Sequence, residues 1–228
     1  MDITTMNETL SSQSLLRLMS WLSPSFPVGA FSYSHGLEYA VHDGRIADAG
    51  DLEAWLRDLL ERGSAWNDAV LVAESWRRAR AGEDLEDLRA LGEALTGSSE
   101  RHLETVNQGA AFLEAASAWP APVPVELGPD CPLPVAVGAL AGAHGISVEA
   151  TVTAYLHAFT SNLIQAGLRL TSIGQKQGVS VLSALEPVLA ETGRRAATAT
   201  LDDLGSATFL AEIAAMKHEM QHSRIFRS

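Results

Sequence analysis

The sequence predicts an all-α protein, a single-domain bundle of about eight to ten helices. Apolar residues recur at spacings of three and four along most of the chain, and no segment sustains the alternation typical of a strand. The length of 228 residues is that of one domain, with ordinary contents of 46% hydrophobic and 19% charged residues. We therefore expect one domain over residues 1–228, with a flexible N-terminus over 1–12.

Five amphipathic helices are expected in the first half of the chain. Apolar stripes place them over residues 15–22, 52–60, 66–73, 85–95 and 103–113. Asp51 is the expected N-cap of the second, and Gly63 follows its end, as these residue types favour. A short additional helix is expected to begin near Gly36.

A proline-rich segment divides the chain. Trp119–Pro134 holds six prolines and is predicted to be a linker or a long surface loop rather than a helix. After it, Ser147 is expected to cap the longest helix, which runs to about Leu170 and would be roughly 35 Å long. Further helices are expected over 175–189 and 203–220.

Small residues are dense in Val135–Gly145 and Ala196–Ala215. Ala, Gly and Ser on a helix surface allow another helix to approach closely. Tight packing in the core explains this pattern, and the alternative is a flat helical face reserved for an oligomer.

Charge and cysteine content exclude several classes of protein. The net charge of −12 disfavours a nucleic-acid partner, because phosphate binding needs clustered Lys and Arg. Cys131 is the only cysteine, so an internal disulfide and a CxxC metal or redox site are excluded, and its thiol is expected to be buried or idle. Apolar runs fall short of the roughly 20 residues that span a membrane. The polar start, Met1–Gln13, does not resemble a signal peptide. We expect a soluble, cytoplasmic protein.

The segment Leu22–Ala40 is the most informative part of the sequence. Its prolines disfavour a helix, and Gly29 and Gly36 are suited to positive φ angles. The segment nevertheless holds four of the nine Phe and Tyr residues of the chain. Surface loops are usually polar. A loop this rich in aromatic side chains is therefore either packed into the body of the protein or available to a partner.

The usual catalytic motifs are missing, with one exception. There is no GxxxxGK[ST] loop and no GxSxG elbow. His218–His222 reads HExxH, which on a helix would place two imidazoles on one face and could bind zinc, with Glu219 as a general base. Few residues remain downstream for a third ligand, so a zinc hydrolase is only an alternative here. The other histidines are expected to be structural or at the surface: His35, His42, His144 and His157.

The C-terminal tail, residues 221–228, is locally basic and apolar within an acidic chain. Two interpretations stay open. The tail folds back on its own acidic body, or it becomes ordered against another protein, with Phe226 as an anchor and the arginines Arg224 and Arg227 as donors.

Three stretches of this sequence resemble the UreF family of urease accessory proteins. They are LSPSFPVGAFSYSHGLE at 22–38, the segment from YLHAF at 155–159 to GQKQG at 174–178, and the segment from AMKHE at 215–219 to SRIFRS at 223–228. They occur in the family's order and cover both ends and the middle of the chain. The sequence departs from the family pattern at Ala30, Ser172, Lys176-Gln177 and His222.

The resemblance implies a non-catalytic, all-helical homodimer. UreF proteins join the accessory protein UreD (also called UreH) and the GTPase UreG in a complex that delivers nickel to apo-urease, driven by GTP hydrolysis. It implies no cofactor bound tightly by this chain, because nickel is handled by the complex. The interaction residues carried over are Tyr33, Ser34, His35, Gly36, Glu38, Gln175, Lys176, Arg224, Phe226 and Arg227.

A second role is compatible with the same resemblance. The chain would act as a GTPase-activating regulator of UreG by supplying an arginine to the transition state, an effect worth roughly 10³–10⁵ in rate in other GTPases. The candidates are Arg169, Arg194, Arg195 and the two tail arginines.

Overall fold

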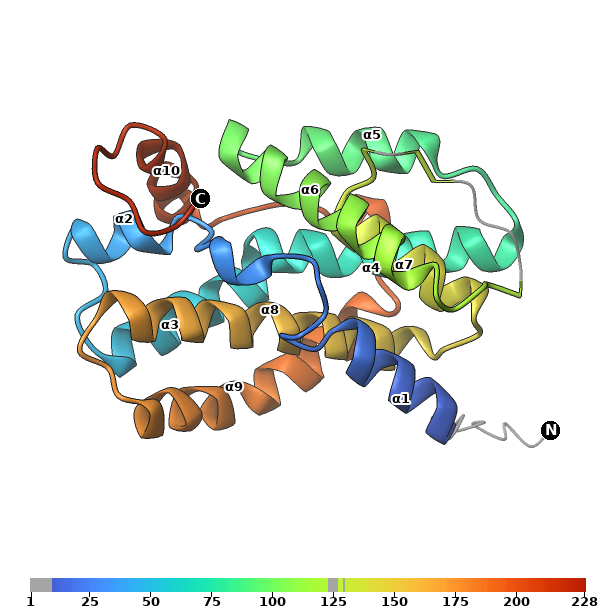
Figure 1. The fold of residues 1–228 in the computed structure, drawn as a ribbon, viewed down its shortest axis with the longest axis horizontal. Helices are drawn as coiled ribbons and strands as arrows, with labels where there is room; N and C mark the ends of the chain where they lie inside the picture. The colour runs from blue at the N-terminus through green and yellow to red at the C-terminus, as the bar shows by residue number, and fades with distance from the viewer. Residues whose placement is uncertain (1–9, 123–126, 129) are drawn as a thin grey trace.

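A computed structural model describes residues 10–122, 127–128 and 130–228 (Figure 1). The described residues form α-helices and short 3-10 helices without a strand, so the predicted all-α class is confirmed. The helices are α1 Ser12–Trp21, η1 Ala30–Ser32, α2 Leu37–His42, α3 Ala49–Arg62, α4 Ser64–Ala81, α5 Glu86–Ala94, α6 Ser99–Ala116, α7 Leu133–Ala143, α8 Val148–Leu170, α9 Gln175–Ala196, η2 Leu201–Asp203 and α10 Phe209–His218.

The long helices α4 and α8 form the centre of the bundle. Helix α4 packs against α7, and α8 packs against both α4 and α9. Helices α2 and α10 pack together at one end of the molecule, and α1 lies at the other end (Figure 1). Of the expected N-terminal flexible segment, residues 1–9 lie outside the described residues, and Ser12 is the first residue of α1.

Side-chain caps fix the helix starts, and one differs from the prediction. Ser147 caps α8 as predicted, accepting the N–H of Ala150 at 3.4 Å. The N-cap of α3 is Asp48 and not Asp51. Asp48 is extended and accepts the N–H of Asp51 at 3.0 Å, while the Asp51 carboxylate accepts the N–H of Asp48 at 3.4 Å. Two aspartates three residues apart form a capping box, and the first of them is the cap.

Tertiary hydrogen bonds shorten the last helix. The prediction of a helix over 203–220 is wrong at both ends, because α10 spans only Phe209–His218. Upstream, the N–H of Gly205 donates to Asn67 Oδ1 at 2.9 Å, and that of Ala207 donates to the carbonyl of Arg62 at 2.8 Å. These bonds hold the segment extended against α4 and the end of α3.

The proline-rich segment contributes the start of a helix. Within the expected loop 119–134, residues 123–126 and 129 lie outside the described residues, and Leu133 and Pro134 already belong to α7. A proline in the first helical turn removes an N–H that has no partner in the helix anyway. Cys131 is fully buried beside this start, as expected, and burial raises the pKa of its thiol to about 12.

Glycines set the distance between α4 and α7. A Cβ on Gly142 would lie 2.6 Å from the carbonyl oxygen of Trp76 and 3.2 Å from its Cα. Because these atoms are backbone, they cannot move without separating the helices. The small residues of 135–145 therefore serve tight core packing, the first of the two interpretations.

Replacing Gly142 with alanine tests this packing. We expect Gly142→Ala to lower the free energy of unfolding by about 2–3 kcal/mol through overpacking, measured by urea denaturation. Gly205→Ala is the matched control, since a Cβ there meets nothing within 4 Å, and it should change stability by less than about 0.5 kcal/mol. Equal stabilities of the two variants would contradict the proposed close approach.

Candidate interaction site

The N-terminal motif and the C-terminal tail form one structure. Tyr33, Ser34, His35, Gly36 and Glu38 are all buried, and the residues that contact them include the tail. The sequence predicted these two segments as interaction residues separately. The structure brings them together at the end of the bundle where α2 meets α10 (Figure 1).

Glu38 is the centre of this site. Its carboxylate is 5% exposed and accepts the backbone N–H groups of Ile225 at 2.8 Å and Phe226 at 2.9 Å. Its second oxygen also lies 3.2 Å from Nε2 of His218. A buried carboxylate is stable only when hydrogen bonds replace its lost water, and the two backbone N–H groups of the tail supply them here.

Ser34 and Glu104 hold the last residue of the tail. The N–H of Ser34 donates to the carbonyl oxygen of Ser228 at 2.9 Å, and its hydroxyl donates to the same oxygen. The hydroxyl of Ser228 in turn donates to Glu104 at 2.7 Å. We call Ser34, Glu38, Glu104 and His218 the tail clamp.

Gly36 is required at its position for two reasons. Its φ of +77° lies in the left-handed region, and a Cβ there would lie 2.7 Å from the backbone nitrogen of Ala215 in α10. The neighbouring His35 is also left-handed, at a φ of 58°. Its Nε2 lies 2.6 Å from the Ser64 hydroxyl, and its ring packs edge-on against Phe159.

Burial and nearby charges shift two pKa values at the clamp. Burial and, to a smaller extent, the nearby guanidinium of Arg101 together lower the pKa of His35 to about 4. The imidazole is therefore neutral at pH 7. Burial alone would raise the pKa of Glu104, but its ion pair with Arg101 outweighs this and lowers the pKa to about 2. Glu104 therefore remains an acceptor for the Ser228 hydroxyl at any ordinary pH.

The tail is folded back on its own acidic body. Phe226 is 4% exposed within its own chain, so it is not presented as an anchor for a partner. The guanidinium of Arg169 lies over its ring at 4.4 Å and donates to the carbonyl of Phe31 at 2.8 Å. Arg224 pairs with Glu100, whereas the Arg227 side chain is exposed. Ordering of residues 221–228 by a partner stays a prediction.

The HExxH segment is not arranged as a zinc site. Helix α10 ends at His218, so His222 does not share a helical face with it. The buried ring of His218 is engaged on both sides, Nδ1 with Glu100 at 2.6 Å and Nε2 with Glu38. The Glu219 carboxylate accepts the N–H of Ser99 at 2.7 Å. In the part of the chain that the structure describes, no three His, Cys, Asp or Glu side chains are grouped to hold a metal ion.

Two predicted residues lie elsewhere. Gln175 and Lys176 are exposed at the start of α9, which runs below α8 in Figure 1, whereas α10 lies above it. The structure does not bring them to the tail clamp.

An exposed apolar face of α10 is a feature that sequence reasoning missed. The spacing of its members, 209, 213, 216 and 220, was visible, but the sequence does not reveal which face of a helix is covered. We call this surface the α10 face; it consists of Phe209, Leu210, Ile213 and Met216 of α10 and Met220 in the turn after it. Phe209 is 72% exposed and Met220 81%.

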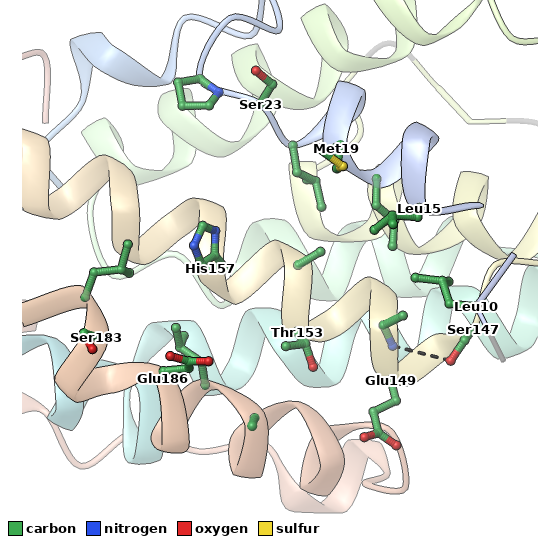
Figure 2. Close-up of a pocket in the computed structure, with 18 of the residues that line it drawn as sticks. Leu10, Leu15, Met19, Ser23, Ser147, Glu149, Thr153, His157, Ser183 and Glu186 are labelled. Atoms are coloured by element: carbon green, nitrogen blue, oxygen red, sulfur yellow. Dashed lines mark hydrogen bonds between the residues drawn. The ribbon is translucent and has the colours of Figure 1, made fainter. Parts of the chain in front are cut away.

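A second uncovered apolar surface is a groove of about 1050 Å³ between α1, α8 and α9. Figure 2 shows Leu15 and Met19 on one side of it, Glu186 on the other, and His157 of α8 between them. Leu16 and Met19 of α1 are 64% and 62% exposed. None of the described helices has the length and apolarity to cross a membrane.

These features define a helical protein in which the described residues form no metal cluster. The motif residues hold a tail in place, and apolar side chains lie uncovered on two surfaces. The chain belongs to the UreF family, whose model matches residues 46–186.

Curated relatives carry the same family name. A protein of Brucella anthropi named urease accessory protein UreF 1 is 58% identical over 228 residues, covering all of both chains. A protein of the same name from Brucella canis is 60% identical over 214 residues, 94% of each chain. Urease accessory protein UreF of Mesorhizobium japonicum is 56% identical over 223 residues, 98% of this chain and 100% of its own.

Lowering the pH should reduce the free energy of unfolding, because His35 is buried in its neutral form. A histidine held neutral by burial stabilises the folded state above its ordinary pKa of 6.5, and this contribution is lost as the pH falls toward about 4. We expect a loss of about 3 kcal/mol over this range relative to His35→Asn, since Asn tolerates the left-handed backbone and does not titrate.

The comparison with the variant is essential, because Asp68 acts in the opposite direction. Burial raises the pKa of its carboxyl from 3.8 to about 6, so its contribution increases as the pH falls. Chemical denaturation of both proteins at pH 7.5 and 4.5 checks the prediction. Parallel pH dependence in the two proteins would contradict it.

Proposed function

We propose that the chain is a non-catalytic adaptor in urease maturation. It joins UreD (UreH) and the UreG GTPase in a complex that assists GTP-dependent nickel insertion into apo-urease. Membership of the UreF family supports this proposal, as do relatives named urease accessory proteins. Nickel is the cargo of the complex in this proposal and not a resident cofactor of this chain.

The α10 face is the observation that carries the proposal. Contiguous exposed apolar side chains mark protein contacts, because their burial by a partner removes apolar surface from water. The tail extends this surface, since the clamp leaves Ile225 63% exposed while it buries Phe226. We therefore place the UreD contact on the α10 face together with Ile225, Arg224 and Arg227.

The tail clamp supports the same role by fixing the geometry of the contact. An ordered tail has already lost its conformational entropy, so a partner that binds it does not need to order it. In this proposal Phe226 anchors the tail to its own chain, and the adjacent exposed residues contact the partner.

The alternative role, a GTPase activator that supplies an arginine, has less support. Arg169 lies over Phe226, Arg195 lies over Trp66, and Arg194 is paired with Glu191. Each would have to leave these contacts to reach a nucleotide in UreG. Arg227 is the candidate with an exposed side chain and no such contact in the described residues, and it falls within the surface proposed for UreD.

The groove of Figure 2 is the surface we propose for a homodimer. Leu15 and Met19 of α1 form one wall of the groove, and Leu16 projects from the same helix with 64% of its surface exposed. A ridge beside a groove is the self-complementary arrangement that a twofold contact between two copies requires. Gln175 and Lys176 remain proposed partner contacts on α9.

A charge on the α10 face should abolish binding of UreD without unfolding the chain. Ile213 is 43% exposed and Met216 47%, so Ile213→Asp and Met216→Asp keep the core intact. We expect at least tenfold weaker binding to purified UreD, and urease from cells carrying either variant should contain less nickel. Ala184→Asp, which places the same charge on an exposed position of α9, is the control.

Two results would separate the parts of this proposal. Normal UreD binding by both variants would overturn the placement of the contact. Normal nickel content in urease from cells that lack the whole chain, under scarce nickel, would overturn the adaptor role itself.

The dimer surface has a separate test. We expect Leu16→Asp to shift the chain from dimer to monomer in sedimentation velocity, because an aspartate on the ridge would have to be buried without a partner charge. Leu103→Asp is the control, since Leu103 is 56% exposed on α6. A wild-type monomer, or a variant that still dimerises, would contradict the assignment.

A further inference from the structure

A second hollow lies inside the bundle, beneath the N-terminal loop. It has a volume of about 490 Å³ and is lined by residues of α1, α4, α6, α7, α8 and α9, with residues of the loop over it. This volume falls in the range of small-molecule sites in proteins. It adjoins the groove of Figure 2, with which it shares Leu22, Pro24 and Leu182, and Glu104 of the tail clamp lies in its wall. None of the roles proposed above places a ligand in it.

Aromatic rings form much of its wall. Trp21 and Phe112 line it and are packed edge to face, with centroids 5.9 Å apart, and both are at most 1% exposed. Tyr155 and Phe159 of α8 line it as well. Aromatic faces attract both apolar groups and organic cations.

The charged end of the hollow carries an excess of negative charge. Asp68, Arg101 and Glu104 all line it, and Arg101 pairs with Glu104. His35, beside Glu104, is neutral at pH 7. Two carboxylates therefore face one guanidinium, and Asp68 is the carboxylate without a direct ion pair.

Asp68 is half-buried, and one of its carboxylate oxygens has a hydrogen bond within the described residues. The hydroxyl of Tyr155 donates to its Oδ2 at 2.8 Å. Burial raises the pKa of the carboxyl to about 6, which reflects a charge that the surrounding protein does not fully compensate. Perturbed carboxyls in a hollow of this size are frequent at binding sites.

Two further polar groups that line the hollow have no hydrogen-bond partner among the described residues. They are the indole nitrogen of Trp21 and the hydroxyl of Ser161, both buried. Buried polar groups in proteins are almost always paired with protein or with ordered water, so these two groups offer hydrogen-bonding capacity at the hollow.

From this combination we infer that the hollow is a binding site for a small organic cation, an ammonium group on an apolar body. The ammonium would donate to Asp68, and the apolar body would lie against Phe31 and Phe159, the lining rings that are not fully buried. A purely structural pair of Asp68 and Tyr155 would explain their shared hydrogen bond. It would not explain the hollow, the second carboxylate oxygen or the two orphan groups.

Three probes of similar shape and different charge test the assignment. We expect 2-phenylethylammonium to bind the purified chain at pH 8 at least tenfold more tightly than 2-phenylethanol or 3-phenylpropionate, measured by isothermal titration calorimetry. Asp68→Asn should reduce the preference for the ammonium at least tenfold. The amide keeps an acceptor for the Tyr155 hydroxyl but lacks the negative charge. Asp58→Asn, at an exposed acid of α3, should leave it unchanged.

Acidification provides a second readout that a structural role would not produce. The groups facing Asp68 are Tyr155 from α8, Arg101 and Glu104 from α6, and His35 from the loop beside Glu104. The pKa of Arg101 and Tyr155 is raised, that of Glu104 is lowered to about 2, and that of His35 to about 4. Asp68 is thus the group that titrates between pH 8 and 5, and binding of the ammonium should weaken several-fold across this range.

The outcomes are distinct. Equal binding of the ammonium and the alcohol would overturn the cation assignment and leave an apolar site. Absence of binding by all three probes, in a chain that retains its helical circular dichroism, would overturn the site. Because the assay uses this chain alone, neither result bears on the adaptor role.

Discussion

The buried carboxylate of Glu38 is the interaction on which this end of the molecule depends. It takes two backbone N–H groups from the tail and faces His218 at the end of α10. Each of these groups would be costly to bury alone, and together they satisfy one another. One side chain near the start of the chain therefore fixes α2, α10 and the tail relative to each other.

The N-terminal loop combines small polar residues with aromatic residues and prolines, because its two sides contact different parts of the protein. Its Ser34 and Gly36 meet the tail and α10, where a hydroxyl and a missing side chain are needed. On its other side, Pro24 and Phe31 line the internal hollow, and the ring of Phe26 packs against Phe112 of α6. The sequence left open whether the aromatic side chains of this loop pack into the protein or stay available to a partner. Tyr33 is buried and Phe26 and Tyr39 are half-buried, whereas Phe31 is 68% exposed.

Local chemistry made the helices predictable, and long-range contacts made the site unpredictable. The stripe from Val148 to Leu170 and its Ser147 cap are visible in the sequence, because periodicity and capping act within a few residues. Asp51 was predicted as the N-cap of α3 in place of Asp48 because both aspartates belong to the same capping box. The late start of α10 depends on upstream hydrogen bonds to Asn67 and Arg62, and the Glu38 site joins residues 187 positions apart; no local pattern encodes either.

That separation also sets the order in which the protein becomes complete. During synthesis Glu38 leaves the ribosome long before Ile225 and Phe226 exist, and its carboxylate must stay hydrated until they arrive. The bundle of α3 to α9 can be assembled earlier, since its contacts need no tail residue. The surface formed by α10 and the tail is therefore the last part to acquire its shape, so a partner that recognises this surface would distinguish finished chains from nascent ones.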